Sequence, residues 1–286
     1  MSATFHYIEE PLLTFGEGQT ADDPRDGLAL FGPCESQSVL PDHVVIGTES
    51  GIALWRQWCD TLNSPASCVD VNRQRAWPPY PGYEVAYGAR WPYPAKTYPL
   101  DAQELHAGAH KSDRHERAYA VASMYLQPYG RVQRLDSRPA LAIMVVPDEV
   151  YDNCRPQTSV ADKSDEPRSG EERKYLNKVL KDHGRGQMRM LEFDDEELLA
   201  GDTDLEKFGM SPDFRRQIKA RVMQYDMPIQ IIRESTLTVT EKVRNGEPGD
   251  NPLSDRLWNF CTVLYYKCGR KPWKTPWARD GVCYVG

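Results

Sequence analysis

The feature that most constrains the fold is a continuous apolar run, Ala140-Leu141-Ala142-Ile143-Met144-Val145-Val146, which ends at Pro147. No polar residue interrupts the run, so a strand built from it has no face suited to water. A strand buried on both faces is typical of a parallel sheet that is covered by helices. The run therefore predicts a buried strand in a parallel sheet.

Other segments repeat the alternation of strand and helix. Val44–Thr48 predicts a short apolar strand, and the small-residue turn Glu49-Ser50-Gly51 leads from it into an apolar-periodic helix, which is the opening of a βαβ unit. Pro228–Arg233 predicts a further strand. Helices are expected over 101–127, from a Ser211 N-cap to about Tyr225, and from about Pro252 to Cys268. The expected fold class is α/β, with a Rossmann-like parallel sheet flanked by helices.

Three segments do not follow this alternation. Residues 1–40 are rich in Gly, Pro and Asp and are expected to be extended. Residues 76–99 are dense in proline and aromatic residues, which predicts an ordered loop with one helical turn at Tyr83–Tyr87. The rings of this loop either pack within the protein, the favoured interpretation, or stack on nucleic-acid bases. The acidic segment of about 155–210 is interpreted as a surface insertion.

Charge and cysteine content exclude several classes of protein. The net charge of −7 argues against a protein coated with nucleic acid, but an excess of Lys and Arg over 206–274 leaves room for a local basic pocket. The seven cysteines contain no C-x-x-C pair, so a disulfide framework or a zinc site is not expected, and reduced thiols fit a cytoplasmic protein. No signal peptide and no membrane span are predicted.

Several segments, taken in order, resemble the short prokaryotic Argonautes, which consist of MID and PIWI domains. The resemblance covers nearly the whole chain and is carried by Glu10–Gly16, Asp23–Leu28, Phe31-Gly32-Pro33, Pro81–Gly88, Asp213–Arg221, Pro228–Leu237, Leu264–Gly269 and Lys271-Pro272-Trp273. Each segment alone is a weak signal, and the ordered set is the specific one.

The resemblance implies a domain organisation. An N-terminal segment over 1–40 would precede a MID domain over 41–274, and 275–286 would begin a truncated PIWI domain of the RNase H-like class. Gly281–Gly286 would be the first strand of that incomplete domain, and the carboxylates that cleave a target would lie beyond it. The resemblance therefore implies a chain that is not an enzyme and does not cleave nucleic acid.

The resemblance also implies a pocket for the 5′-phosphate of a guide strand, formed by Arg215, Lys219, Gln230 and Lys267. Arg215 and Lys219 are spaced i and i+4 on one helix face. Arg215 stands where an aromatic residue is more common in the family, and would exchange base stacking for a charge-assisted contact. Arg216 competes with Arg215 for this role, and further backbone contacts are expected from Lys271 and Lys274.

Each of these residues also has an ordinary structural interpretation. The cations of residues 215–221 can form a solvated helix face. Gln230 can cap a strand end, and Lys267 can complement the negative end of a helix dipole.

The expected partners follow from the family. They are a guide RNA, target DNA in a complete complex, and an effector protein with an APAZ region fused to a TIR, SIR2 or nuclease domain, acting together in defence against invading DNA. A Mg²⁺ ion at the guide 5′-phosphate is a possible cofactor. The alternative is a scaffold that docks on the effector through the N-terminal segment and the aromatic loop, without binding nucleic acid itself.

A third alternative is a Rossmann-like enzyme that binds a mononucleotide, and it ranks last because only Gly47 and Gly51 approach a glycine-rich phosphate turn. His106 and His110 share a helix face near His115, but no third ligand has a clear spacing, so no metal site is predicted. Ser50 lacks the context of a nucleophile elbow.

Overall fold

The computed structural model describes residues 12–36, 42–68, 74, 77–156, 158, 211–238, 243–244, 247–248 and 251–275. The chain divides into two compact units. The sheet unit comprises Asp42–Arg56 and Pro94–Thr238, and the α11 unit comprises Met1–Pro41, Gln57–Tyr93 and Val239–Gly286. These units do not coincide with the predicted boundaries near residues 40 and 274, which stay a prediction.

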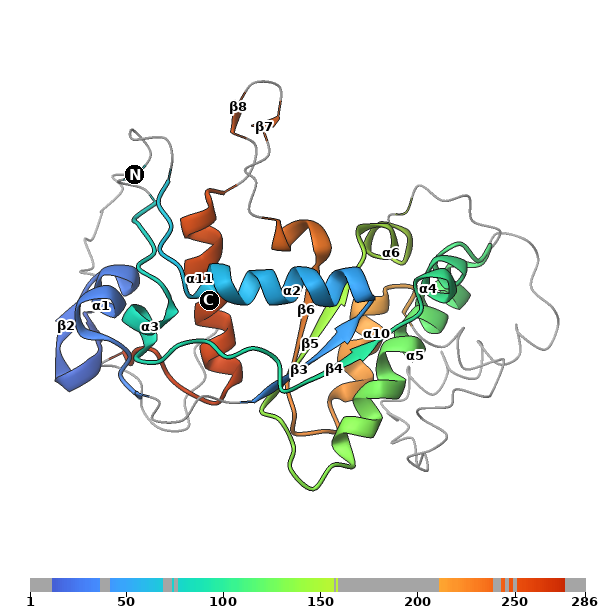
Figure 1. Cartoon of the computed structure of the whole chain (residues 1–286), viewed down its shortest axis with the longest axis horizontal. Coiled ribbons are helices and arrows are strands. Elements are labelled where there is room, and N and C mark those ends of the chain that lie inside the picture. Colours follow the sequence, from blue (N-terminus) through green and yellow to red (C-terminus); the bar gives the residue numbers. More distant parts are fainter. Residues whose placement is uncertain are drawn as a thin grey trace, which may run out of the picture. The chain divides into compact units, whose positions relative to one another are not determined.

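The sheet unit is built on four parallel strands in the order β4-β3-β5-β6 (Figure 1). The strands are β3 (His43–Gly47), β4 (Lys96–Pro99), β5 (Leu141–Val146) and β6 (Ile229–Arg233). All residues of β3 and β5 are buried, as their uninterrupted apolar sequences predict. The register pairs Val44 with Ala142 and Met144 with Ile231. The predicted α/β fold class is confirmed.

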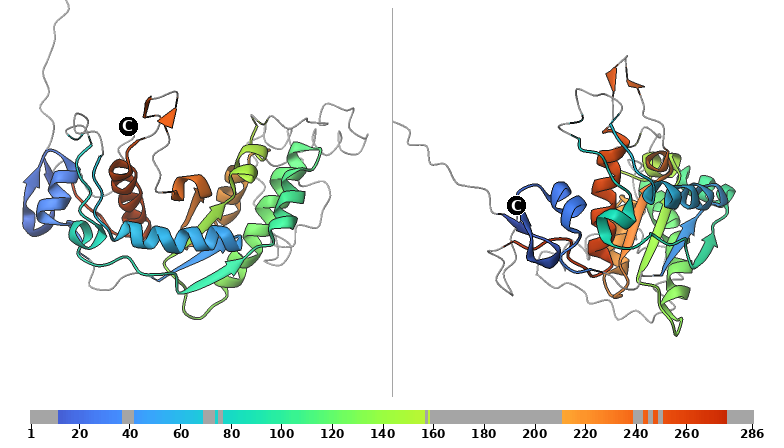
Figure 2. Two further views of the ribbon diagram at one scale, coloured as in Figure 1. Left: turned by 45° about the horizontal axis from the view of Figure 1, so that its top comes forward. Right: turned by 60° about the vertical axis from the view of Figure 1, so that its left-hand side comes forward.

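Helices cover both faces of this sheet, as the views in Figure 1 and Figure 2 show. One face packs against the long helices α4 (Ala102–Ala109), α5 (Arg114–Gln133) and α10 (Phe214–Val222) through a shared apolar core. The other face is covered by the first part of α2 (Glu49–Leu62), where Gly51 approaches Val145 so closely that an added Cβ would lie 2.9 Å from its side chain.

The α2-facing side of the sheet also buries a histidine. Trp55 donates an indole N–H to Nε2 of His43 over 2.9 Å. Burial lowers the pKa of His43 to about 4, because the charged imidazolium would lose its hydration. On the opposite face, the buried hydroxyls of Tyr125 and Tyr129 donate to the carbonyls of Val145 and Met227, both over 2.7 Å. Each of these three hydrogen bonds gives a buried polar side chain a partner inside the core.

The α11 unit is organised by the aromatic loop and the helix α11 (Leu253–Lys267). The predicted helical turn is confirmed as α3 (Tyr83–Tyr87). The hydroxyl of Tyr80 donates to the carbonyl of Leu62 over 2.9 Å, and Tyr87 lies 3.0 Å from the hydroxyl of Thr262. The rings of Tyr80, Tyr83, Tyr87 and Trp91 are all buried. These four rings therefore pack within the protein rather than forming a stacking surface for bases.

The N-terminal segment differs from the extended conformation that its sequence predicted. Short pieces β1 (Leu13–Thr14), η1 (Gly16–Gly18) and β2 (Thr20–Ala21) precede the helix α1 (Pro24–Phe31). The helix forms because the side chain of Asp23 accepts from the backbone N–H groups of Arg25 and Asp26, and because Pro24 occupies the first helical position. A salt bridge between Arg25 and the buried Asp255 joins α1 to α11.

Two helix boundaries also differ from prediction. The segment 101–127 forms two helices, because Asp113 caps a new helix that continues to Gln133. The helix predicted from Ser211 begins at Phe214, where the side chain of Asp213 rather than Ser211 accepts the first backbone N–H groups.

The remaining described elements are α6 (Asp148–Asn153), η3 (Glu234–Leu237), and the antiparallel pair β7 (Val243–Arg244) and β8 (Glu247–Pro248). No helix in the described part of the chain combines the length and apolar character needed to cross a bilayer. The strand predicted at Gly281–Gly286, and most of the predicted insertion over 155–210, lie outside the described residues.

Candidate functional site

Three arginines surround one tyrosine ring at the carboxyl edge of the parallel sheet. The guanidinium carbons of Arg233, Arg155 and Arg215 lie 4.1, 4.4 and 5.6 Å from the centre of the Tyr151 ring. All three distances fall within the range of cation–π attraction. Arg215 also donates to the Tyr151 hydroxyl over 3.3 Å. We call Tyr151, Arg155, Arg215 and Arg233 the arginine cluster.

The topology of the sheet unit brings these residues together. Tyr151 lies on α6, which begins directly after β5 and Pro147. Val146 and Arg233 are register partners, so the ends of β5 and β6 meet at the same edge. The N–H of Phe214 donates to the carbonyl of Cys154 over 3.1 Å, which fixes the start of α10 beside the end of α6. The first turn of α10 therefore presents Arg215 to the ring of Tyr151.

Two carboxylates hold one of the arginines in place. Arg233 donates to Asp148 over 2.7 Å and to Asp152 over 3.4 Å. Burial favours a higher pKa for Asp148, but hydrogen bonds from Ser235 and Arg233 outweigh it and lower the pKa below its ordinary value. Asp148 is therefore a fixed anion that orients Arg233.

Arg155 and Arg215 differ from Arg233 in their charged neighbours. Neither forms an ion pair with a carboxylate among the described residues, and both are half-buried against Tyr151. Guanidinium groups present planar pairs of N–H donors that match the oxygens of a phosphate. Within the described residues, the cluster therefore combines one arginine paired with carboxylates and two that have no carboxylate partner.

The structure places the predicted phosphate ligands in three different positions. Arg215 lies in the arginine cluster, and Lys219 follows one turn later on α10 with an exposed side chain. Arg216, the competitor of Arg215, is exposed. Arg215 and Lys219 are thus the two predicted residues that the structure brings together, on a single helix face.

Gln230 lies on the other face of the sheet. Ile229 and Ile231 belong to the core that α10 covers, and Gln230 alternates with them along β6. Its register partner Ile143 alternates in the same way with Ala142 and Met144. The side-chain amide of Gln230 donates to the carbonyl of Ile231 over 3.0 Å.

The other predicted lysines belong to the α11 unit. Lys267 lies in the last turn of α11 and is half-buried. Lys274 forms a 3.6 Å ion pair with Glu35, and its backbone pairs with Thr14. The backbone N–H of Lys271 donates to the same glutamate over 3.1 Å. Joint action of Arg215, Lys219, Gln230 and Lys267 stays a prediction.

The sequence analysis missed Tyr151, Arg155 and Arg233. Arg155 fell at the edge of the expected surface insertion, and Tyr151 lacked any motif of its own. A usable signal existed for Arg233, because it ends a predicted strand, and the carboxyl ends of neighbouring parallel strands meet at one edge where α/β proteins commonly place ligands.

The same edge holds a second polar group, at the point where the strand order reverses between β3 and β5. Thr48 donates to the carboxylate of Glu234 over 3.0 Å, and Ser50 donates to it over 3.4 Å. The backbone N–H of Gly51 donates to the Thr48 hydroxyl over 3.1 Å. The start of α2 thus faces a carboxylate at the position where a mononucleotide-binding fold places its phosphate.

The chain was compared with protein families, curated proteins and solved structures. No family model matches the chain, and no curated protein matches it. Among solved structures, the chain is similar to Clostridium butyricum Argonaute bound to a guide DNA (5′ deoxycytidine) and a 19-mer target DNA, with a TM-score of 0.41 and 14% sequence identity. The alignment covers 94% of this chain and 24% of that protein, so the chain spans about a quarter of its length.

Proposed function

We propose that this chain binds the 5′-phosphorylated end of a guide nucleic acid, with RNA as the favoured guide, and that it does so without cleaving a target. The arginine cluster carries the proposal, because it places two arginines beside a half-exposed aromatic ring, and neither of them is paired with a carboxylate of the described residues. A terminal phosphate is a compact dianion that such donors recognise well. The resemblance of the sequence to short Argonautes supplies the identity of the ligand.

In this proposal, the arginine cluster and Lys219 bind the terminal phosphate. Arg215 belongs both to the arginine cluster and to the phosphate ligands that the resemblance implies. The ring of Tyr151 holds the guanidinium groups in position from one side, so that less side-chain entropy is lost when they bind an anion. Gln230 and Lys267 remain proposed phosphate contacts of lower priority, whereas Arg216, Lys271 and Lys274 remain proposed contacts to the guide backbone.

The residues around Tyr151 do not fit the Mg²⁺ ion that the resemblance suggests. The cluster supplies cations, whereas Mg²⁺ is held by carboxylate and other oxygen ligands. Asp148, a carboxylate beside the cluster, already accepts from Arg233 and from both the hydroxyl and the backbone N–H of Ser235. The proposal therefore assigns the neutralisation of the phosphate to arginine and lysine alone.

The biological setting is proposed from the resemblance. The complete assembly would include target DNA and an APAZ-containing effector of the TIR, SIR2 or nuclease type, and would act in the cytoplasm against invading DNA. The structure disfavours the alternative of a Rossmann-like enzyme that binds a mononucleotide. The carboxylate of Glu234 lies beside the start of α2 and would repel a phosphate there.

The alternative function is a docking scaffold for the effector. Its support is an exposed apolar group in the N-terminal segment, where Leu30 is 73% and Leu12 is 52% exposed. The aromatic loop, the other proposed docking element, has most of its rings buried against its own unit. The scaffold alternative therefore depends on the N-terminal segment.

The test is a titration of the full chain with a short RNA that carries a 3′ fluorophore and either a 5′-phosphate or a 5′-hydroxyl. We expect the phosphate to tighten binding at least about tenfold at moderate salt, since one charge-assisted contact contributes about 1.5–3 kcal/mol. Arg215→Gln and Arg155→Gln should remove most of this preference. Lys219→Ala should reduce it.

Arg216→Gln is the matched control, because it removes the same charge from the neighbouring position on α10, where the side chain is exposed. It should leave the preference for the 5′-phosphate intact. Equal binding of both RNAs by the wild-type chain would disprove the proposed function. Equal sensitivity of Arg215→Gln and Arg216→Gln would instead show a general electrostatic effect without a defined phosphate pocket.

A further inference from the structure

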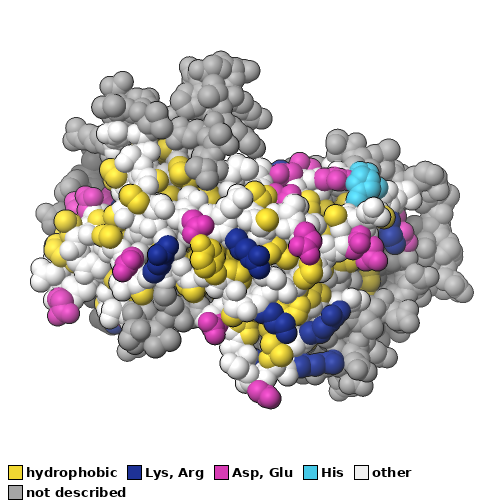
Figure 3. Space-filling view, viewed as in Figure 1, with side chains coloured by type: hydrophobic (Ala, Val, Ile, Leu, Met, Phe, Trp, Pro, Cys, Tyr) yellow, Lys and Arg dark blue, Asp and Glu magenta, His cyan; other side chains and the backbone are white. Residues whose placement is uncertain are grey.

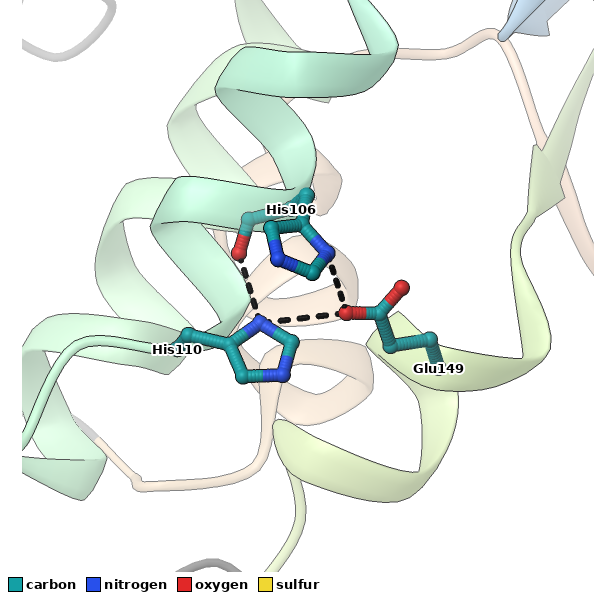
Figure 4. A group of neighbouring side chains, drawn as sticks. All are labelled: His106, His110 and Glu149. Carbon is teal, nitrogen blue, oxygen red and sulfur yellow. Dashed lines mark hydrogen bonds and ion pairs between the residues drawn. The ribbon is translucent and has the colours of Figure 1, made fainter.

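Two histidines and a glutamate converge on the surface of the sheet unit, and none of the three belongs to the arginine cluster. His106 and His110 are one turn apart on α4, and Glu149 lies in the first turn of α6. Nδ1 of His106 is 2.6 Å from Oε1 of Glu149, and Nδ1 of His110 is 3.0 Å from the same atom. Figure 4 shows both rings turned toward this carboxylate.

The three side chains form a ligand set of known chemistry. We propose that His106, His110 and Glu149 bind a divalent transition-metal ion of the zinc class. Two imidazole nitrogens and one carboxylate oxygen are borderline ligands that suit Zn²⁺, Co²⁺, Ni²⁺ and Cu²⁺, whereas Mg²⁺ and Ca²⁺ prefer oxygen ligands throughout. Three protein ligands leave the fourth tetrahedral position to water.

The spacing of the ligand atoms fits this assignment. One ligand atom from each of the three residues lies within 4.8 Å of the others. Ligands at about 2.1 Å from a tetrahedral zinc ion are separated from one another by roughly 3.4 Å. The two distances to Glu149 need to lengthen by less than about 1 Å to reach that geometry.

The setting permits this adjustment. The side chains of His106, His110 and Glu149 are 63%, 41% and 43% exposed, so the contact that has to give way for metal binding is the 2.9 Å hydrogen bond between Nδ1 of His110 and the carbonyl of His106. Figure 3 shows histidine side chains as one surface patch in the region of α4 and α6. The helical spacing of four residues keeps both rings on one face of α4 whatever the rotation of Glu149.

A neighbouring amide completes the site. Nδ2 of Asn153 lies 3.3 Å from Nε2 of His110. A histidine that ligates a metal through one ring nitrogen commonly donates its other N–H to a neighbouring acceptor, which fixes the ring. A flip of the Asn153 amide would turn its oxygen to His110 for that purpose, since the side chain is already in place.

The metal site and the arginine cluster use different sides of the same short helix. Glu149 and Tyr151 are two residues apart on α6, which places them about 200° apart around the helix axis. A bound cation would therefore link α6 to α4 without entering the cluster. The metal proposal is independent of the proposed nucleic-acid function.

The test is a calorimetric titration of the full, metal-stripped chain with Zn²⁺, followed by Co²⁺ binding measured from its visible d–d absorption. We expect one ion per chain at this site, a tetrahedral type of Co²⁺ spectrum, and a higher melting temperature with Zn²⁺, because the ligands come from two helices. His106→Gln, His110→Gln and Glu149→Gln should each weaken binding at least about tenfold.

Glu104→Gln is the matched control on α4, because it removes an exposed carboxylate from the same helix and should leave Zn²⁺ affinity unchanged. The proposal is overturned if the wild-type chain binds no Zn²⁺, or if the triple variant retains wild-type affinity and the Co²⁺ spectrum. Circular dichroism of each variant confirms that the fold is retained.

Discussion

Tyr87 and Tyr151 show two uses of the same side chain. Tyr87 is fully buried in the α11 unit, where it stacks on Tyr83 with 4.6 Å between ring centres and meets the hydroxyl of Thr262. Tyr151 is half-exposed in the sheet unit, and its neighbours are three guanidinium groups. All contacts of the first ring are made within the protein, whereas the second ring orients two arginines that have no carboxylate partner among the described residues.

The difference teaches where aromatic residues indicate function in this chain. The stretch rich in tryptophan and tyrosine is the conspicuous one in the sequence, yet its rings at 80, 83, 87 and 91 form part of a core. The isolated Tyr151 carries the charge cluster. Local density of aromatic residues therefore predicts packing here, and the nature of the neighbours predicts binding.

The largest expected effect is on stability. Tyr87→Ala should lower the free energy of unfolding by about 3–5 kcal/mol, because it removes a buried aromatic ring and leaves a cavity. Tyr151→Ala should cost less, about 1–2 kcal/mol, because the ring is partly exposed although it packs against the core beside Phe214. Urea unfolding followed by circular dichroism measures both. A similar loss for the two variants would break the comparison.

The buried imidazole of His43 can gain a proton, so it predicts how the stability of the sheet unit depends on pH. The pKa of His43 is about 4 in the folded chain and about 6.5 when unfolded, so the unfolded state takes up the proton first as the pH falls. Stability is therefore lost between pH 6.5 and pH 4, by about 3 kcal/mol over that window. Urea titrations at several pH values should show a shallower dependence for His43→Gln, and an unchanged dependence would remove His43 as the cause.

The next effect concerns binding. Tyr151→Ala should weaken the binding of 5′-phosphorylated RNA by about tenfold, because the three guanidinium groups lose the surface that orders them. Tyr87→Phe should leave the same affinity unchanged. Fluorescence anisotropy with the two RNAs of the main titration gives both values. Equal affinities for Tyr151→Ala and the wild-type chain would mean that the ring does not organise the site.

The smallest effect isolates the hydroxyl groups. Tyr87→Phe removes the contact with Thr262 in a buried place and should cost about 1 kcal/mol. Tyr151→Phe removes only an acceptor for Arg215 in a partly exposed place and should change the free energy of unfolding by a few tenths of a kcal/mol at most. Thermal unfolding of the two variants, run side by side, resolves the difference.

Much of the sheet unit could be predicted because strands that are buried on both faces consist almost entirely of apolar residues. The runs at 44–46 and 140–146 are apolar at every position, so both strands follow from the sequence. The edge strand β4 could not be predicted, because Lys96–Pro99 is polar and lies within the proline-rich stretch. Helix α1 was missed because its Asp23 cap and Pro24 start stand in a segment rich in glycine and proline.

The candidate site was less accessible to sequence analysis. The spacing of Arg215 and Lys219 places them on one helix face whatever the fold. Arg233 and Tyr151 meet only through the pairing of β5 with β6, and no local pattern encodes that register. The same register decides which face of the sheet carries Gln230. Matching Gln230 to a phosphate ligand of the family does not reveal that face.

The hydrogen bond between the N–H of Phe214 and the carbonyl of Cys154 has a practical consequence for engineering. It means that Cys154 and Phe214 are neighbours in the sheet unit, although they are far apart in the sequence. A splice that keeps Arg155 and Asp213 and joins them by a short glycine-serine linker should therefore preserve both strands on either side. The excised portion becomes an exchangeable cassette, into which a foreign sequence or a reporter can be placed beside the arginine cluster.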